Sequence, residues 1–580
     1  MFFFFVCCRR YCCCCCAAGS WPKSERCSTQ GSPDHVSWYR VMNQRMEEDD
    51  YGEGFIAESH PLRPTHLNVP LRESRAPSIS SSVTDMDVPI YTRDTTIPLS
   101  GKLGFNPHLA FAIGAAAIGS AFQHGFNTGV VNAPEAVMKS WMTDIEKSRD
   151  NVTDPDAATQ KSYEDHATML WAVAVSVFCA GGMFGGCMIG WAADRFGRKG
   201  SLLINNALVV LAVIFEAIAK PTASWELFIV GRLFIGINSG LNAGLTPMYL
   251  SEISPLNLRG AVGTVYQLVI TISILVAQVL GMSKLMGTAE LWPYLFSLTI
   301  IPAVVQLVTL PFCPESPKYL LLSRGKDMDA QRSLTWLRGT IEVHEEMEEM
   351  RIEHETMKLT PKVTLKELFL NPSLRIPIFI AIMMMLAQQF SGINAIMFYS
   401  TSIFEMANLR GEKAQNATIG VGVVNVLMTF VSMILVEKAG RKTLLLIGFL
   451  GMTIVTTLLA ICLIFSDYEA CSIMAVVLVI VYIILFASGP GSIPWFLVSE
   501  LFNQSARPTA SSVAIAINWT ANFFVGIGFP PVKAIMDSYV FFVFAGLQCF
   551  FTLFIWFKVP ETRNKSIEEI SSMFRQRTYQ

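Results

Sequence analysis

Side-chain amides occur inside the most apolar stretches of this chain. An unpaired amide in hydrocarbon costs several kcal/mol, so each one needs a partner. Taken singly, each is best explained as a hydrogen bond between helices. Taken together, they suit a neutral polyol, because an amide donates and accepts hydrogen bonds as a hydroxyl does. The amides are Gln123, Asn127, Gln267, Gln278, Gln388, Gln389, Asn394, Asn425, Asn518 and Asn522.

A break in one apolar stretch lies near this amide set in the second half of the chain. Gly489-Pro490-Gly491 is followed by Pro494 and Trp495, so helix hydrogen bonds are lost and the backbone is loosened. Lipid does not tolerate such a break, but the lining of a cavity does. The break is either a simple kink or a hinge, and we favour the hinge. The tryptophan could cover the apolar C–H face of a sugar ring.

Charged motifs recur in the same order along the chain. Three motifs repeat at offsets of 243, 248 and 246 residues, which indicates an internal duplication. The pairs are Gly197-Arg198-Lys199 with Gly440-Arg441-Lys442, Ser251-Glu252 with Ser499-Glu500, and Pro314-Glu315-Ser316 with Pro560-Glu561-Thr562.

These charges either set the membrane topology or form a cytoplasmic latch. A latch would hold the two halves together by ion pairs when the cavity faces outward. Surface pairs are individually weak, so only a network could do this. Because the acids recur together with the bases, we favour the latch. Its predicted members are Asp194, Arg195, Arg198, Lys199, Arg232, Glu252, Arg259 and Glu315, and then Glu437, Arg441, Lys442, Glu500, Arg507 and Glu561.

Composition places the chain in a membrane. Hydrophobic residues make up 52% of its 580 residues and charged residues 16%, and the mean hydropathy is +0.42. The net charge of −2 argues against nucleic acid as a partner. We predict an all-α membrane protein of two six-helix bundles. The twelve spans start near Leu109, Met169, Ser201, Glu226, Val262, Leu291, Pro377, Ala417, Thr443, Ser472, Ala510 and Tyr539.

The basic residues predict that both termini are cytoplasmic. We expect a disordered tail at 1–104, bundles at 105–313 and 376–557, a helical inter-bundle segment at 314–375 and a short tail at 558–580. The run Cys12 to Cys16 is either palmitoylated or part of an inconsequential extension, and we favour the extension. The polar loop 132–168 carries a glycosylation sequon at Asn151 on the outer side.

Several strings together resemble the sugar porters of the major facilitator superfamily, and specifically the animal facilitative glucose transporters. The resemblance covers 105–575. The strings are Phe122 to Gly129, Asp194 to Lys199, Pro247-Met248-Tyr249, Pro314 to Leu320, Gln388 to Asn394, Gly489 to Trp495 and Pro560-Glu561-Thr562.

This resemblance implies the major facilitator fold and a set of site residues. Phe398 and Tyr399 would stand at the outer gate. Two departures from the family pattern bear on the substrate. Ala487 stands where many relatives carry a Glu. Met385-Leu386-Ala387 stands where a Gln-Leu-Ser is associated with glucose preference, so fructose is kept as a second possible substrate. The implied sugar contacts are Gln267, Gln388, Gln389, Asn394, Asn425, Trp495 and Asn518.

The sequence favours a uniporter over its rivals. Proton-coupled relatives have an Asp where this chain has Asn127, and an amide does not titrate in the working range. Sensors of this fold tend to have long C-terminal tails, whereas about 22 residues follow the last predicted span here. No metal cluster or nucleophile–base pair is visible. We therefore expect a plasma-membrane hexose uniporter that uses no cofactor and works as a monomeric unit, and we do not expect an enzyme.

Overall fold

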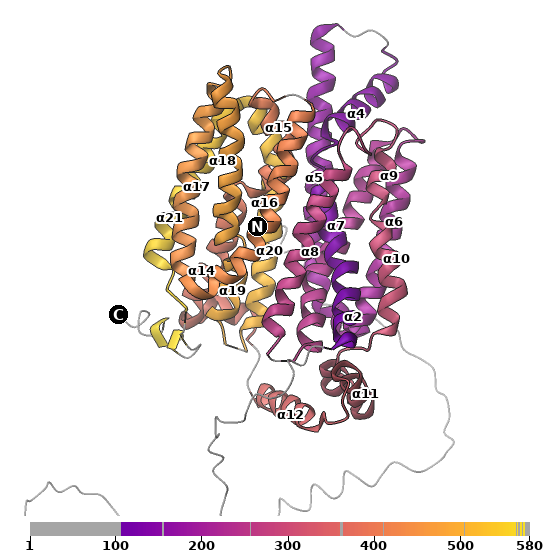
Figure 1. Cartoon of the computed structure of the whole chain (residues 1–580), viewed down its shortest axis with the longest axis vertical. Helices are drawn as coiled ribbons and strands as arrows, with labels where there is room; N and C mark the ends of the chain where they lie inside the picture. Colours follow the sequence, from indigo (N-terminus) through magenta and orange to yellow (C-terminus); the bar gives the residue numbers. More distant parts are fainter. Residues whose placement is uncertain are drawn as a thin grey trace, which may run out of the picture. The chain divides into compact units, whose positions relative to one another are not determined.

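A computed structural model describes most of the chain after the amino-terminal tail. The described residues are 106–152, 156–255, 257–359, 363–409, 411–503, 505–563, 565, 569–570 and 572–574. The predicted tail at 1–104 and its cysteines lie outside them. The regular elements within the described residues are all helices, and most run side by side in two groups (Figure 1).

The first half contains six membrane-spanning segments. The first and sixth are built from shorter helices, and the other four are continuous. In order, the segments are α2–η1–α3 (Pro107–Ala116, Ala117–Ala121 and Phe122–Gly129), α5 (Ala157–Phe196), α6 (Arg198–Ala219), α7 (Trp225–Ile253), α8 (Arg259–Leu280) and α9–α10–η2 (Trp292–Ser297, Ile300–Thr309 and Leu310–Phe312).

The second half repeats this plan. Its segments are α14–α15 (Pro372–Phe390 and Ile393–Met406), α16 (Glu412–Ala439), α17 (Arg441–Ile464), α18–α19 (Glu469–Ser488 and Ile493–Leu501), α20 (Arg507–Met536) and α21 (Val540–Lys558).

Hydropathy alone finds eleven stretches in the described residues that could cross a bilayer. The last one, Arg507–Lys558, is 52 residues long. It is divided by η4 (Asp537–Tyr539) into α20 and α21, so it crosses twice. The prediction of an all-α membrane protein with about twelve spans is therefore confirmed.

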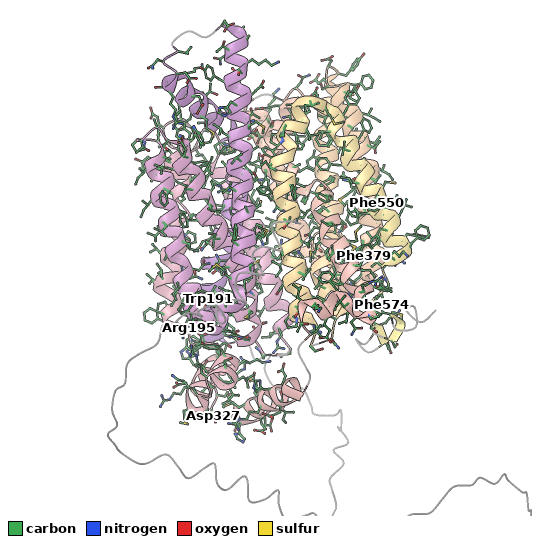
Figure 2. The ribbon with its side chains drawn as sticks, turned by 180° about the vertical axis from the view of Figure 1, so that it is seen from behind. Trp191, Arg195, Asp327, Phe379, Phe550 and Phe574 are labelled. Atoms are coloured by element: carbon green, nitrogen blue, oxygen red, sulfur yellow. The ribbon has the colours of Figure 1, made fainter. Side chains whose placement is uncertain are left out.

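Large apolar side chains cover the outside of the helix groups. Trp191, Phe379 and Phe550 are each more than half exposed and point away from the ribbon (Figure 2). In water such a surface would be unfavourable, whereas in lipid it is the ordinary solvent-facing side of the protein.

Glycines bring the helices of the first half into close contact. A Cβ at Gly236 or Gly240 of α7 would collide with the backbone of Phe178 or Gly182 on α5. A Cβ at Gly182 would also meet the ring of Trp519, which lies on α20 in the second half. Because lipid provides no hydrophobic drive between helices, this close backbone packing contributes to holding the spans together.

The segment between the first and second spans differs from the loop expected there. Residues Glu135–Arg149 form α4, and α5 begins at Ala157, about twelve residues before the expected start of the second span. The Asp156 side chain caps α5 by accepting a hydrogen bond from the Thr159 N–H (3.3 Å). Asn151, the predicted glycosylation site, is exposed directly after α4.

Short helices also occupy the segment between the halves, at the end of the molecule opposite α4 (Figure 1). They are α11 (Asp327–Arg338), α12 (His344–Leu359) and α13 (Leu365–Leu370). Arg338 joins α11 to α7, because its guanidinium donates to the Ile253 carbonyl (2.8 Å). The last residues of the segment join the second half, where the Thr509 hydroxyl donates to the Val363 carbonyl (2.8 Å).

Candidate substrate-binding site and gates

Four of the amides implied as sugar contacts form one buried cluster in the second half. Asn518 on α20 donates to Gln388 Oε1 (2.8 Å), and Gln389 donates to Asn518 Oδ1 (3.0 Å). Asn394 donates to Gln389 Oε1. Gln388 and Gln389 lie at the end of α14, Asn394 lies at the start of α15, and none of the four is more than 9% exposed. We name these four residues the amide cluster.

The broken helix lies directly against the amide cluster. Helix α18 ends at Ser488 and α19 starts at Ile493, so the predicted break is present. The carbonyls of Pro490 and Gly491 accept hydrogen bonds from Gln388 Nε2 (3.1 and 2.8 Å). The site and the predicted hinge therefore share a side chain, and movement of the break would move Gln388. Pro494, also assigned to the hinge, is buried at the start of α19.

The other implied contacts do not join this cluster. Gln267 on α8 is exposed, and its side chain has no hydrogen-bond partner among the described residues. Asn425 on α16 is half-buried, and its carbonyl accepts from the Thr429 hydroxyl (2.8 Å). Trp495 is 42% exposed. In this conformation these three side chains do not contribute bonds to the amide cluster.

The implied outer-gate residues are buried in the second half. Tyr399 interrupts α15 with a non-helical backbone (φ −132°, ψ 20°). Its hydroxyl donates to the Gly526 carbonyl (3.2 Å), and its ring stacks on Phe529 at a centroid distance of 5.4 Å. Phe398 packs edge-on against Tyr399 at 6.3 Å.

A residue absent from the predicted site joins the two halves beside the implied outer gate. Asn132 follows the first span and is fully buried. Its Nδ2 donates to the Met397 carbonyl and to Ser400 Oγ (both 2.7 Å), and its Oδ1 accepts from the Thr401 N–H (3.1 Å). The position of Asn132 just beyond an amide-bearing span, two residues before Pro134, is the signal that could have identified it.

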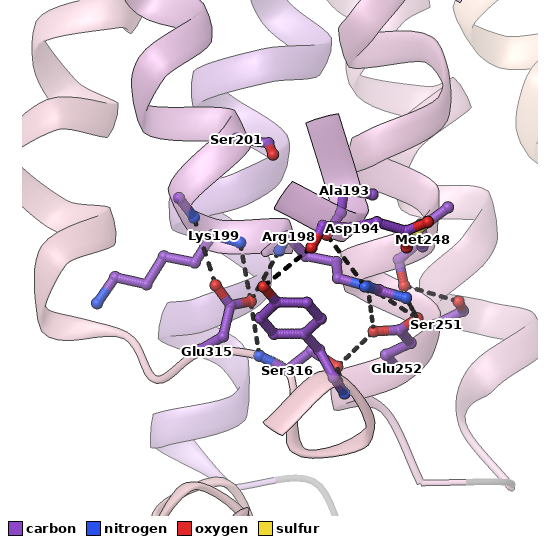
Figure 3. Close-up of polar contacts among 12 residues, drawn as sticks. Ala193, Asp194, Arg198, Lys199, Ser201, Met248, Ser251, Glu252, Glu315 and Ser316 are labelled. Atoms are coloured by element: carbon purple, nitrogen blue, oxygen red, sulfur yellow. Dashed lines mark hydrogen bonds and ion pairs between the residues drawn. The ribbon is translucent and has the colours of Figure 1, made fainter. Parts of the chain in front are cut away.

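The repeated charged motifs form the same structure in each half, at the end that the sequence predicts to be cytoplasmic. In the first half, the Glu315 carboxylate accepts from the backbone N–H groups of Arg198 and Lys199 (both 3.0 Å) at the start of α6 (Figure 3). The Arg198 guanidinium pairs with Glu252 (2.9 Å), which also accepts from the Ser316 hydroxyl. A carboxylate is favoured here because helix N-termini carry free N–H groups.

The second half matches this arrangement bond for bond. Glu561 accepts from the N–H groups of Arg441 and Lys442 (2.9 and 3.0 Å), Arg441 pairs with Glu500 (2.9 Å), and Thr562 donates to Glu500 (2.5 Å). Gly197 and Gly440, which precede the two helices, both have positive φ (82° and 89°). A Cβ at either glycine would also meet the carboxylate, so both backbone shape and space require glycine.

Two observations bear on the predicted latch. First, Arg198–Glu252 and Arg441–Glu500 each lie within one half, so they do not hold the halves together in this conformation. Second, several predicted members make other contacts. The carbonyls of Asp194 and Arg195 accept from Tyr319 and Arg324, while Arg259 and Arg507 donate to the carbonyls of Ser251 and Phe502. The side chain of Glu437 lies outside the described residues.

Arg232 is not a latch residue at all. It lies seven residues after the start of α7, far from Glu252 near the other end of that helix, and it is 1% exposed. Its guanidinium donates to the Asn127 carbonyl (3.1 Å) and lies over the Phe178 ring (4.8 Å), and the buried Glu216 acts on it electrostatically. The sequence did not indicate that Arg232 is buried beside Glu216, because the two residues lie on different spans, α6 and α7.

Comparisons with known proteins agree with this geometry. A family model described as sugar (and other) transporter matches residues 112–574. The chain belongs to this sugar transporter family. It is 45% identical over 475 residues to the rat solute carrier family 2, facilitated glucose transporter member 3, which covers 82% of this chain and 94% of the rat protein. It is 43% identical over 503 residues to facilitated glucose transporter protein 1 of Caenorhabditis elegans. This match covers 86% of this chain and 96% of the nematode protein.

A solved structure shares the fold of this sugar transporter. The partially occluded inward-open conformation of the xylose transporter XylE from E. coli matches with a TM-score of 0.66 at 25% identity, over 80% of this chain and 100% of that chain. The chain is therefore a multi-pass membrane transporter of the major facilitator superfamily, and it is not an enzyme.

The first half of the transporter holds a second buried amide network, of which the sequence analysis named only Gln123. Gln123 donates to Asn206 (2.8 Å), and Asn206 donates to Gln306 (2.9 Å). Gln306 donates in turn to the Ser120 hydroxyl (2.7 Å). Because these residues bond to one another, this network fits the interpretation that amides join helices.

Acid is expected to weaken the Glu561 contact of the transporter. Burial would raise the pKa of this carboxyl, but backbone N–H groups, those of Arg563, Arg441 and Lys442 among them, together hold the pKa below its usual value. The stabilisation is therefore present above the ordinary carboxyl pKa and is lost as the pH falls through the lowered one. Glu561→Gln should lower the unfolding temperature at pH 7, and the difference from wild type should shrink on acidification. A difference that is independent of pH would contradict this assignment.

Proposed function

We propose that this transporter is a facilitative hexose uniporter of the plasma membrane, with both termini cytoplasmic. It moves sugar down its gradient by alternating access. The observation that carries the proposal is the amide cluster, four uncharged side chains that both donate and accept hydrogen bonds next to a broken helix. A sugar hydroxyl can replace any of these amide–amide bonds without leaving a charge unpaired.

D-glucose is the first candidate substrate and fructose is the second. Relatives described as facilitated glucose transporters support glucose. Fructose is kept because Met385 contacts the site: its Sδ accepts from Asn518 Nδ2 (3.5 Å). The triplet Met385-Leu386-Ala387 therefore borders the amide cluster at the position where it departs from the glucose-associated pattern.

Uniport is favoured by the neutral residue in the first span. Asn127 donates to Thr299 Oγ1 (2.6 Å), and its backbone carbonyl accepts a hydrogen bond from Arg232. Its amide carries no proton that it could release at neutral pH. A similar solved protein, XylE, is described as a proton:xylose symporter. Symport is therefore the alternative that an experiment must exclude.

Alternating access is supported by the uneven contacts between the halves. At the outer end, Asn132 bonds to α15 across the interface. At the cytoplasmic end, the Arg198–Glu252 and Arg441–Glu500 pairs stay within their own halves. This pattern fits an inward-facing state, in which any bonds between the two cytoplasmic motifs have parted.

Counterflow in proteoliposomes tests the proposal. Vesicles preloaded with unlabelled D-glucose should take up labelled glucose transiently, and a protonophore should leave the rate unchanged. Unlabelled glucose, galactose, fructose and inositol then compete in turn to rank the substrates. A protein that shows no counterflow is a sensor and not a carrier, and uptake that collapses with the protonophore is symport.

A further inference from the structure

A cavity lined by charged residues lies at the outer end of the interface between the halves. The first half contributes residues of α4, and the second half contributes residues of α15, α20 and η4. The cavity borders the predicted gate residue Tyr399 directly. Its polar and charged lining includes Glu135, Lys139, Tyr399, Ser402, Lys533 and Asp537.

Glu135 of the first half lines this cavity with a carboxylate of which only one oxygen has a hydrogen-bond partner among the described residues. It is the first residue of α4, and it is 7% exposed. Its Oε1 accepts from Lys139 of the same helix (2.6 Å), whereas its Oε2 is fully buried and has no hydrogen-bond partner in the described part of the chain. A buried carboxylate oxygen without a partner is unfavourable, so a cation across the cavity would stabilise it.

Lys533 of the second half is a cation that lines the same cavity. It lies near the outer end of α20, and its ammonium donates to Ser402 Oγ (2.5 Å). An ammonium has three donors, so two remain for other groups. The Glu135 carboxylate attracts Lys533 electrostatically, and the Lys139 ammonium, which lines the same cavity, repels it. Glu405 and Asp537 add negative charge on the side of the second half.

We propose that Glu135 and Lys533 are gate residues of the transport cycle, and that their attraction across the interface holds the outer ends of the halves together beside Tyr399. The inference rests on the alternating access described under the proposed function. Charges attract more strongly inside a closed cavity than in water, so the attraction is present when the outer gate is closed and is lost when water enters. Asn132 supplies the uncharged part of the same closure.

This gate has a consequence on each side of the membrane. A carrier binds sugar from outside only in the fraction of molecules whose outer gate is open. The apparent dissociation constant for outside sugar therefore equals the intrinsic constant divided by that fraction. Weakening the attraction between Glu135 and Lys533 should therefore lower the half-saturation constant for sugar entry and raise the one for sugar exit. A residue with a merely structural role would lower the amount or turnover of protein without moving the two constants in opposite directions.

Charge reversal and charge exchange test the pair in full-length protein. Glu135→Lys and Lys533→Glu, each alone, should shift the two half-saturation constants for labelled glucose in opposite directions, each by about fivefold (about 1 kcal/mol). The double variant should return both constants to within about twofold of wild type, as expected for coupled residues. Lys161→Glu and Asp165→Lys, exposed on the outer extension of α5, make the same charge changes away from the cavity and should have no effect.

Three results would overturn the gate. They are single reversals that leave both constants unchanged, constants that move in the same direction, and a double variant no closer to wild type than the single ones. Where a reversal prevents folding, Glu135→Gln and Lys533→Gln are measured in the same way and should give a smaller shift in the same directions. Wild-type protein that equilibrates no hexose would instead refute the proposed function itself.

Discussion

Replacing Arg232 with leucine is expected to destabilise the folded transporter by about 3–5 kcal/mol, because it leaves a buried carboxylate without its cation. Glu216 is 1% exposed, and its Oε1 has no hydrogen-bond partner among the described residues. The buried guanidinium of Arg232 acts electrostatically on this carboxyl group. The Asn127 carbonyl would lose a donor at the same time. The effect should appear as a large drop in the unfolding temperature of purified protein.

Two further variants separate this explanation from a general packing defect. Arg149→Leu removes an exposed pair with Glu226 (2.7 Å), and it should cost no more than about 1 kcal/mol. Combining Arg232→Leu with Glu216→Met removes both buried charges and should recover much of the lost stability. If the double variant is no more stable than Arg232→Leu alone, Glu216 is not the partner that matters.

Gln388→Leu is expected to raise the half-saturation for glucose by about 5- to 150-fold, which corresponds to about 1–3 kcal/mol for a polar group left unpaired. Gln388 bonds to Asn518 and also to the carbonyls of Pro490 and Gly491. We therefore expect turnover to fall as well, because the side chain links the site to the break between α18 and α19. Equilibrium binding and counterflow would measure the two effects separately.

Gln306→Leu is the matched control. Gln306 is also a buried membrane amide, but it belongs to the network of the first half, with Ser120 and Asn206 as partners. This variant should lose stability and keep its half-saturation constant. If both variants change affinity equally, the amide cluster is not the sugar site. If neither does, the assignment made from the family resemblance is wrong at Gln388.

The sequence predicted the break at Gly489 to Pro494 and the pairing of basic with acidic motifs, because both are local patterns. Glycine and proline disrupt a helix wherever they occur. The repeated motifs indicated that one local structure occurs twice, and Glu315 and Glu561 do cap equivalent helices. The same patterns could not show that each Arg–Glu pair stays within its own half, since that depends on how the halves are tilted.

Arg232 and Asn132 show where reading from sequence fails. The sequence analysis assigns Arg232 to the cytoplasmic latch, but its partners lie on the first, second and third spans. Asn132 lies 268 positions from Ser400, so only the folded chain shows that they bond. Neither contact has a local signature in the sequence, because each depends on helices that are far apart along the chain and meet only in the folded protein.

By itself, the sequence determined the membrane environment, the number of spans, the duplication and the identity of the amides, because hydropathy and repetition are properties of the chain read in order. The tertiary structure decided which four amides meet, which half each ion pair belongs to, and which charges face one another at the outer gate. Hydrogen bonds and ion pairs act over a few ångströms, and only the packing of the helices brings distant residues within that range.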